Sequence, residues 1–273
     1  MRVTRERSKH FDQSLIVNPD NHGQVAWSQF NEHYHSLQTT HWSKINKGRN
    51  YPWYRRMVRL SMAWVMQKND AIMDMRGKAR WLWSMPIKRD PDIVFFGAEV
   101  GWEAALVQAL YGDGGRVVLI DNDPAAHERF TKSPTELTVQ APRGFGSKEL
   151  VVRRPLERIE YVRKDVFTYQ DDAAFDVGID WGLIEHFSEP RKLELMHTMQ
   201  AFLRPGGLQV SAVPRNTRIS RSFYWAFRDE LNFGYRELMS KREFSQLLKR
   251  GGYEPGKILT SPSTCVACST VAR

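Results

Sequence analysis

The sequence of 273 residues has little cysteine and no long apolar run. Its two cysteines, Cys265 and Cys268, lie in the segment TCVACSTV, and two thiols cannot complete a four-ligand zinc site. We interpret this CxxC as part of a final strand, with a redox or metal role as the alternative. No apolar run of about 18 residues is present to cross a bilayer. The charged start MRVTRERSKHFDQSL also has no apolar signal segment, so we expect a cytoplasmic protein.

Metal ligands are also scarce. The segment HYHSLQTTHW contains His33, His35 and His41, which is the densest group of histidines in the chain. On a helix, His33 and His35 point about 200° apart and cannot bind one ion from the same face. We therefore expect no metal site.

Excess positive charge is confined to the first third of the chain. The net charge is +9, and residues 1–90 contain 16 Lys and Arg against 7 Asp and Glu. A basic, aromatic segment can bind nucleic acid, a membrane surface or an acidic substrate, because cations attract anions and rings stack or insert. The alternative is a helical layer that packs on the rest of the protein with its charges in water. The same third holds six of the nine tryptophans: Trp27, Trp42, Trp53, Trp64, Trp81 and Trp83.

The periodicity of the sequence changes near residue 91. Residues 24–38 and 53–83 have apolar residues at helical spacing, and the break NKGRNYPW separates them. From residue 91 onward, short apolar strands such as DIVFFG, RVVLID and LQVSAVP alternate with helical segments, which predicts a doubly wound parallel α/β sheet. We predict a helical, basic, aromatic-rich lid or substrate segment over residues 1–90 and an α/β domain over residues 91–273.

Residues 131–160 interrupt that alternation. The segments ELTVQA and ELVVRR flank PRGFGSK, which is rich in proline and glycine. Two strand-like segments around such a turn predict an inserted β-hairpin.

The stretch DIVFFGAEVGWEAAL runs from a strand into a helix, with Gly97 and Gly101 at the bend. In α/β sheets, ligands bind beyond the carboxyl ends of strands, where a glycine bend allows the backbone to approach them. Asp121 ends the next strand about twenty residues later, where a carboxylate can accept hydrogen bonds from both hydroxyls of a ribose. The spacing indicates a cofactor that contains a nucleoside, and a tight turn without a ligand is the alternative.

Two residues of this bend argue against a dinucleotide. Glu99 lies between the glycines and Trp102 follows them, and a carboxylate facing a pyrophosphate would repel it. S-adenosylmethionine has a ribose and an adenine but carries a sulfonium and an ammonium in place of phosphates. The bend is therefore compatible with S-adenosylmethionine.

Downstream segments carry a family resemblance. FDVGIDWGLIEHF and AFLRPGGLQVSAVP resemble motifs of the class I S-adenosylmethionine-dependent methyltransferases, as do LIDNDP and RKDVF. The resemblance covers roughly residues 91–273 and implies a seven-stranded, Rossmann-like methyltransferase sheet, here with a helical N-terminal extension and an inserted hairpin. The sequence departs from the family pattern where Phe95 replaces an acid and Glu99 replaces a glycine.

The resemblance also implies roles for individual residues. Glu99 either reaches the ammonium of the cofactor or faces solvent. The other implied contacts are those to the methionine by Gly97, Ala98 and Gly101, to the ribose by Asp121 and Asn122, to the adenine by Asp165 and Val166, and to the sulfonium and ammonium by Asp180 and Trp181.

His186 is the candidate catalytic residue. It follows Glu185 at the LEH position of the family and could orient or deprotonate an acceptor. The alternative is structural, because a histidine at this position also caps or packs the adjoining helix.

The acceptor is inferred from the segment that precedes the first strand, which commonly forms a lid in small-molecule members of the family. Its Trp, Tyr and Met residues favour an aromatic or apolar acceptor, and its arginines, with Arg215, Arg218 and Arg221, could hold an anionic group. We interpret the chain as a small-molecule methyltransferase of a biosynthetic pathway that methylates an O or N atom. An RNA methyltransferase is the first alternative, and a non-catalytic cofactor- or partner-binding protein is the second. The oligomeric state is open, with a homodimer as one option.

Overall fold

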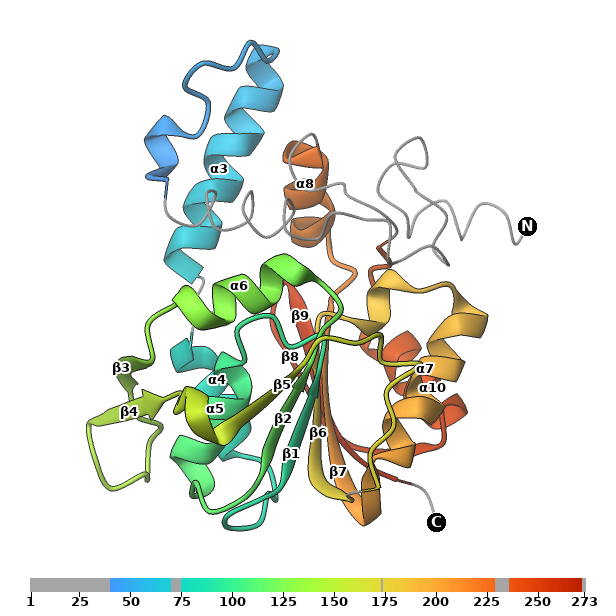
Figure 1. The fold of residues 1–273 in the computed structure, drawn as a ribbon. Coiled ribbons are helices and arrows are strands. Elements are labelled where there is room, and N and C mark those ends of the chain that lie inside the picture. The colour runs from blue at the N-terminus through green and yellow to red at the C-terminus, as the bar shows by residue number, and fades with distance from the viewer. Residues whose placement is uncertain (1–39, 70–74, 173, 229–235, 272–273) are drawn as a thin grey trace.

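A seven-stranded sheet forms the centre of the molecule in the computed structural model, which describes residues 40–69, 75–172, 174–228 and 236–271 (Figure 1). The expected helix over residues 24–38 lies outside the described residues. The strands in spatial order are β5 (Ile159–Val162), β2 (Val117–Ile120), β1 (Ile93–Phe96), β6 (Phe175–Trp181), β7 (Leu203–Pro214), β9 (Thr264–Val271) and β8 (Tyr253–Thr260).

The sheet is parallel except at β9. Strands β5, β2, β1, β6 and β7 pair in parallel, whereas β9 runs antiparallel to both β7 and β8. The sequences IVFF of β1 and VVLI of β2 are completely buried, as expected for parallel strands that helices cover on both faces. The predicted doubly wound α/β sheet is confirmed.

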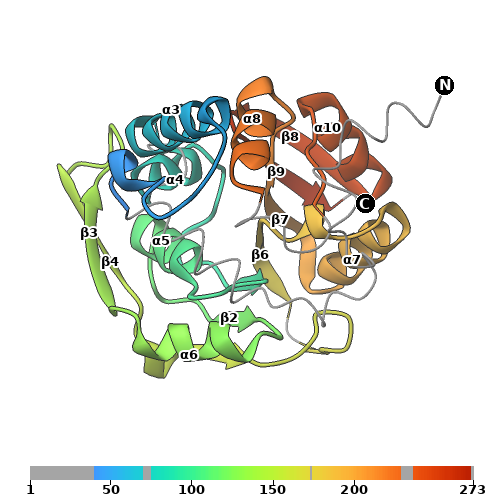
Figure 2. The ribbon, with the colours of Figure 1, turned by 90° about the horizontal axis from the view of Figure 1, so that it is seen from above.

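Helices cover the two faces of the sheet (Figures 1 and 2). One face packs against α4 (Met75–Trp83), α5 (Trp102–Tyr111) and the aromatic ring of Phe130 in α6 (Pro124–Lys132). The other face packs against α7 (Glu189–Ala201) and α10 (Lys241–Arg250). Because α4 contributes Ala79 and Leu82 to the central core, part of the predicted lid segment packs on the sheet itself.

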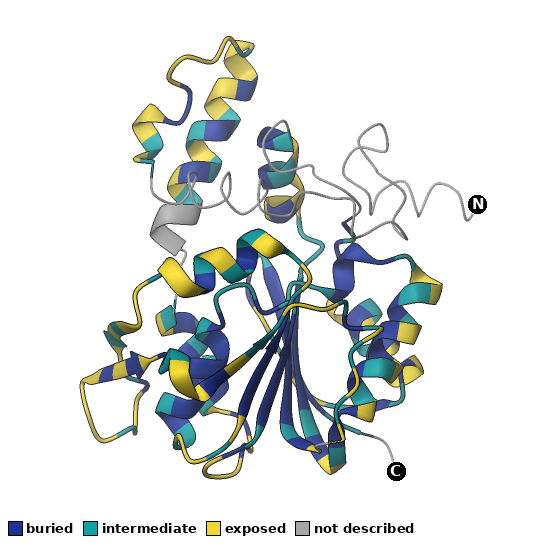
Figure 3. Ribbon diagram, in the orientation of Figure 1, coloured by how far each residue is buried: buried dark blue, intermediate teal, exposed yellow. Residues whose placement is uncertain are grey.

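Three further helices form a smaller layer beyond the carboxyl ends of the strands (Figure 1). This layer consists of η3 (Trp42–Lys44), α3 (Trp53–Asn69) and α8 (Arg218–Ala226), and its core includes Ala63 and Phe223. Much of α3 is exposed, in contrast to the buried strands (Figure 3). The division of the chain at residue 90 stays a prediction.

Arg59 holds this layer together. Its guanidinium is 1% exposed and donates to the backbone oxygen of Ala226 over 2.9 Å and to Asn46 Oδ1 over 3.0 Å. It also stacks between the rings of Tyr51 and Phe227. The carbonyl of Ala226 lies at the C-terminal end of α8, where unpaired carbonyls attract a cation.

The predicted hairpin insertion is confirmed. Strands β3 (Glu136–Gln140) and β4 (Glu149–Arg153) form a separate two-stranded antiparallel sheet. The β4 strand alternates between exposed and buried residues, and its buried Leu150 and Val152 join the core on the α5 side of the main sheet. Hydrophobic contacts therefore hold one face of the hairpin against the domain.

Arg154, immediately after β4, joins the hairpin to the bend after β1. Its side chain is completely buried, and burial lowers its pKa. The guanidinium stacks on the ring of Trp102, the first residue of α5, and donates to four backbone oxygens. These oxygens belong to Val100 (2.9 Å), Phe130 (3.2 Å), Ser133 (3.1 Å) and Pro134 (2.8 Å).

Replacing Arg154 with Met should lower the free energy of unfolding by about 3 kcal/mol, because four carbonyls would lose a charged donor. Urea denaturation at neutral pH measures this difference. The neighbouring Arg153 is the matched control, since its ion pair with Glu136 is exposed and Arg153→Met should change stability by less than about 0.5 kcal/mol. Equal effects of the two substitutions would contradict the role given to Arg154.

Candidate active site

The chain order reverses between β1 and β6, which lie side by side in the sheet. From β1 the chain continues through β2 to β5 on one side, and from β6 it continues to β7 on the other. Ligands of open α/β sheets bind beyond the carboxyl ends of the strands at such a point. Here the two loops touch: a side chain on Gly97 would place its Cβ 3.2 Å from Leu183 Cδ1.

The bend after β1 requires glycine at two positions. Gly97 and Gly101 have φ angles of +64° and +76°, which side chains disfavour. At Gly101 a Cβ would also lie 2.4 Å from Leu119 Cδ1. The predicted residues Gly97, Ala98 and Gly101 thus form a tight turn that enters α5 at the reversal point.

Asp121 connects this bend to the end of β2. Its Oδ2 accepts the backbone N–H of Glu99 over 2.9 Å, and its Oδ1 accepts that of Asp123 over 2.9 Å. Burial raises the pKa of Asp121 to about 6. A carboxylate has about four acceptor positions, so two remain for further donors. Asn122 is exposed beside it.

Glu99 has a contact that neither sequence expectation included. Its φ of +47° is unusual for a residue with a side chain. The carboxylate pairs with Arg129 of α6, with 3.2 Å between Oε1 and Nε. Its backbone oxygen accepts the Tyr161 hydroxyl over 3.0 Å. Contact with a cofactor ammonium stays a prediction.

Asp165 and Val166 lie just after β5, on the far side of β2 from β1. Asp165 Oδ1 accepts the backbone N–H of Phe167 over 2.9 Å and so stabilises the turn. Val166 is buried in the core on the α7 side. The structure brings both to the carboxyl edge of the sheet, and their contacts to adenine stay predictions.

Asp180, at the end of β6, is completely buried. Its Oδ1 accepts the backbone N–H of Leu183 over 3.2 Å, and its Oδ2 has no hydrogen-bond partner in the described part of the chain. Burial, and secondarily the charge of Glu185, raise the pKa of Asp180 to about 8. The structure shows Asp180 as the anchor of the turn after β6, and contact with the sulfonium or ammonium stays a prediction.

Trp181 joins the site to the N-terminal segment. Its ring stacks on that of Trp81 in α4, with 6.2 Å between the ring centroids. Lys78 Nζ lies 5.0 Å from the same ring. Residues on either side of the predicted division at residue 90 therefore meet at this strand end.

A cavity of about 90 Å³ lies beyond the ends of β6 and β7, against α8. Its wall is mainly apolar and aromatic. The lining includes Trp181, Gly182, Glu185, Pro214, Phe223 and Tyr224.

Glu185, and not His186, lines this cavity. Both residues belong to η6 (Ile184–His186), and both are buried, with exposed fractions of 4% and 6%. His186 Nε2 lies 3.7 Å from Glu185 Oε1. A catalytic role for His186 stays a prediction, whereas Glu185 is a site residue that the sequence analysis did not select. The sequence signal that could have identified Glu185 is its position beside His186 in Ile184–His186, the segment that matches the LEH motif of the family.

The three arginines after β7 do not line the cavity. Arg215 donates to the backbone oxygen of Ser261 over 2.8 Å, and Arg218 and Arg221 are exposed on α8. The expected binding of an anionic acceptor group by these arginines is therefore not supported at this cavity.

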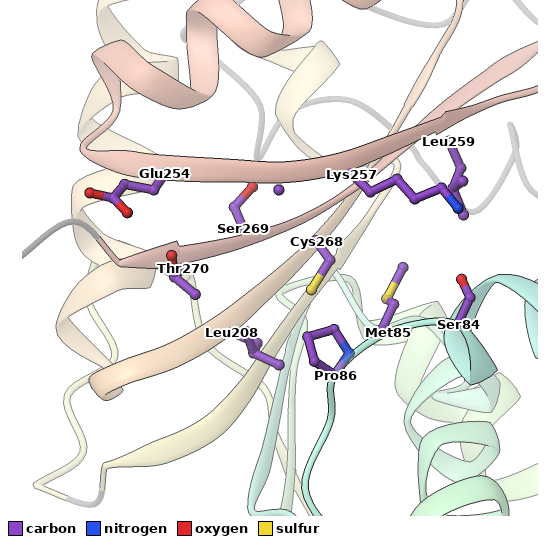
Figure 4. A pocket seen from close by; sticks show the side chains of 11 residues that line it. Ser84, Met85, Pro86, Leu208, Glu254, Lys257, Leu259, Cys268, Ser269 and Thr270 are labelled. Atoms are coloured by element: carbon purple, nitrogen blue, oxygen red, sulfur yellow. The ribbon is translucent and has the colours of Figure 1, made fainter.

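A larger cavity of about 290 Å³ lies away from the reversal point (Figure 4). Met85 and Pro86, just after α4, face Leu208 and Cys268 of the sheet across it (Figure 4). Leu208 pairs with Val177, well before the end of β6. This cavity is therefore remote from the predicted cofactor residues.

The two cysteines lie on opposite faces of β9. Cys265 is buried on the α7 side and Cys268 on the α5 side, and both are free thiols. Burial raises the pKa of each thiol to about 11, which disfavours the reactive thiolate. Their strand position is confirmed, and they cannot act together on one metal or as a disulfide without rearrangement.

Neither a cluster of metal ligands nor a helix fit to span a membrane occurs in the described part of the chain. Within the described ranges, no three His, Cys, Asp or Glu side chains gather as metal ligands. His33 and His35 lie outside those ranges. Among the helices that the structure describes, none is both long and apolar enough for a membrane span.

Comparison with known proteins places the fold. No protein-family model and no curated protein sequence matches the chain. Among solved structures, the chain is similar to the Burkholderia thailandensis 1,6-didemethyltoxoflavin N1-methyltransferase, crystallised with 1,6-didemethyltoxoflavin and S-adenosylhomocysteine. The identity is 16% and the TM-score is 0.51, and the match covers 94% of this chain and 92% of that chain.

Two further solved structures are similar. The pyocyanin biosynthetic protein PhzM has 16% identity and a TM-score of 0.53, over 92% of this chain and 70% of that chain. An S-adenosylmethionine-dependent methyltransferase from Aquifex aeolicus has 14% identity and a TM-score of 0.53, over 76% of this chain and 97% of that chain. At these identities the likeness concerns the fold alone, and the chain has the Rossmann-like fold of the class I S-adenosylmethionine-dependent methyltransferases.

Proposed function

We propose that the protein is an S-adenosylmethionine-dependent methyltransferase that acts on an O or N atom of a small molecule. The observation that carries this proposal is the convergence of the Gly97–Gly101 bend on the Asp121 carboxylate at the reversal point of the sheet. This edge offers a hydrogen-bond acceptor for ribose hydroxyls and the N-terminus of α5.

The chemistry of these residues fits S-adenosylmethionine better than a dinucleotide. Asp165, Asp121 and Asp180 are carboxyl groups at the ends of β5, β2 and β6, and Glu99 follows β1, which lies between β2 and β6. Glu99 is paired with Arg129, and the raised pKa of Asp180 keeps that group mainly neutral at pH 7. The remaining carboxylates of this edge would repel a pyrophosphate and attract the ammonium and sulfonium of S-adenosylmethionine. When bound, this cofactor supplies an electrophilic methyl group.

The wall of the cavity beside Trp181 supports a small acceptor. Pro214, Phe223 and Tyr224 contribute to a largely apolar lining, as is usual for small-molecule sites. The similar solved structures include proteins crystallised with 1,6-didemethyltoxoflavin and with apigenin, both small molecules. A biosynthetic role and a cytoplasmic location belong to the same proposal.

RNA methylation is the second candidate, because α3 exposes both rings and charge. Trp53 is 77% exposed, and Tyr54 and Arg56 are exposed beside it. However, Arg55 and Arg59 are buried and donate to the backbone oxygen of Ala226. Part of the N-terminal positive charge therefore serves packing, which favours the small-molecule proposal.

Asp121→Ala should weaken binding of S-adenosylhomocysteine by about 2 kcal/mol or more, since ribose hydroxyls would lose a charged acceptor. Isothermal calorimetry measures the affinity, and circular dichroism verifies that the variant is folded. Asp113→Ala is the control, because the Asp113 side chain is 73% exposed and away from the bend. Unchanged affinity in folded Asp121→Ala would remove Asp121 from the site, and absence of binding to the wild type would favour a non-catalytic protein.

Incubation with labelled S-adenosylmethionine, total RNA and a small-metabolite extract separates the two enzymatic candidates. We expect label in the metabolites and not in RNA. RNA affinity should stay no tighter than about 10⁻⁶ M at physiological salt, the range of non-specific attraction to phosphates. Specific labelling of RNA alone would replace the small-molecule proposal with the second candidate.

A further inference from the structure

Glu185 is the one carboxylate that lines the cavity beyond β6 and β7 among the described residues. It lies close to the turn after Trp181: a Cβ on Gly182 would be 3.5 Å from Glu185 Oε1. The backbone of Glu185 is fixed, because its oxygen accepts the N–H of Glu237 over 2.9 Å. The carboxylate is therefore held at the end of β6, next to the proposed cofactor site.

One oxygen of this carboxylate has no partner. Glu185 is only 4% exposed, yet its Oε2 makes no hydrogen bond with any described residue. A buried polar atom without a partner is unfavourable by about 1–3 kcal/mol and is rare in folded proteins. A ligand that donates a hydrogen bond from within the cavity would remove this penalty.

Charged groups surround Glu185 on several sides. Burial raises its pKa to about 7, and Arg236 and Lys192 oppose that rise. Lys192 of α7 is itself paired with Glu237. Asp180 of β6, His186 of η6 and Tyr224 of α8 are the other titratable neighbours. The carboxyl group therefore changes charge near neutral pH within a mixed electrostatic environment.

On the basis of the proposed function, we propose that Glu185 Oε2 binds the acceptor by accepting a hydrogen bond from a phenolic O–H or a ring N–H. Phe223 and Trp181 supply apolar surface for the ring that carries this donor. The cavity of about 90 Å³ accommodates the reacting ring of an acceptor, whereas whole drug-sized ligands fill about 300–1,000 Å³.

This assignment excludes an acceptor whose reacting group is anionic. An acid placed in the cavity would face the Glu185 carboxylate, and the nearby Arg218 and Arg221 point to exposed surface instead. The acceptor class is thus a neutral aromatic molecule with one O–H or N–H donor at the ring.

A pair of probes tests the hydrogen bond directly. Phenol has the donor, and anisole is the same ring with that oxygen methylated. Their affinities are measured by ligand-observed NMR on protein saturated with S-adenosylhomocysteine at pH 8. Wild-type protein should bind phenol at least about tenfold more tightly than anisole, the effect of one hydrogen bond to a charged group.

Glu185→Gln should reduce this preference to below about threefold while leaving S-adenosylhomocysteine affinity unchanged. The variant is expected to fold, because the raised pKa means that the folded protein favours a neutral side chain at this position. Glu194→Gln is the matched control, since Glu194 is an exposed residue of α7 paired with Arg191, and it should keep the full preference.

The pH dependence of the preference provides a second, independent test. A phenol has a pKa of about 10, so it stays neutral between pH 5.5 and 8 and only protein groups titrate there. The wild-type preference should increase as pH rises through about 7, when the Glu185 carboxyl becomes a charged acceptor. Glu185→Gln should show no such increase, which separates Glu185 from Asp180 and His186.

Three results would overturn the assignment: equal affinities of the two probes in wild type, no binding of either, or a preference that survives in Glu185→Gln. Failure of the proposed function is a different result, namely no binding of S-adenosylhomocysteine. In that case the probes are measured on the protein alone, and a phenol preference would leave the role of Glu185 in place.

Discussion

Two backbone N–H groups converge on one carboxylate, that of Asp121, and the geometry of the candidate site depends on this convergence. One N–H comes from the bend after β1 and the other from the start of α6. Because the bend holds Glu99 at a positive φ, its backbone needs a specific partner to stay in place. Asp121 supplies that partner from the neighbouring strand.

Burial of Asp121 has an electrostatic consequence for the fold. Its folded pKa of about 6 is above the ordinary value of 3.8, so the folded chain binds a proton more readily than the unfolded chain. This group therefore favours the fold most at low pH, and that contribution is lost as pH rises from about 4 to 6. Above this range the charged carboxylate is retained because two N–H groups compensate part of its desolvation.

Local patterns in the sequence predicted the central strands and the hairpin because each of these has its own signal. Completely apolar runs such as IVFF indicate buried parallel strands, and PRGFGSK indicates a turn. The helix α8 has no equally clear signal. Its C-terminal carbonyl is bound by Arg59, 167 positions earlier in the chain, and such a contact has no local pattern.

Local sequence also does not show which of two neighbouring residues in the candidate site lines the cavity. Glu185 and His186 are neighbours in the LEH segment, and residue type favoured the histidine. Only the packing of η6 against α7 and β7 determines which of the two lines the cavity. Arg153 and Arg154 are likewise adjacent and identical in type, yet one is exposed and the other is completely buried.

The hairpin insertion bears on how rigid the bend after β1 is. Arg154 binds the oxygen of Val100, Tyr161 binds the oxygen of Glu99, and Asp121 binds the N–H of Glu99. Three side chains from separate elements thus fix three consecutive peptide groups, from Ala98–Glu99 to Val100–Gly101, before any ligand arrives. A ligand that docks on a preformed bend loses less conformational entropy than one that must order it. The insertion, although remote from the cavity beside Trp181, therefore acts as a support that pre-organises the bend after β1 for the proposed cofactor.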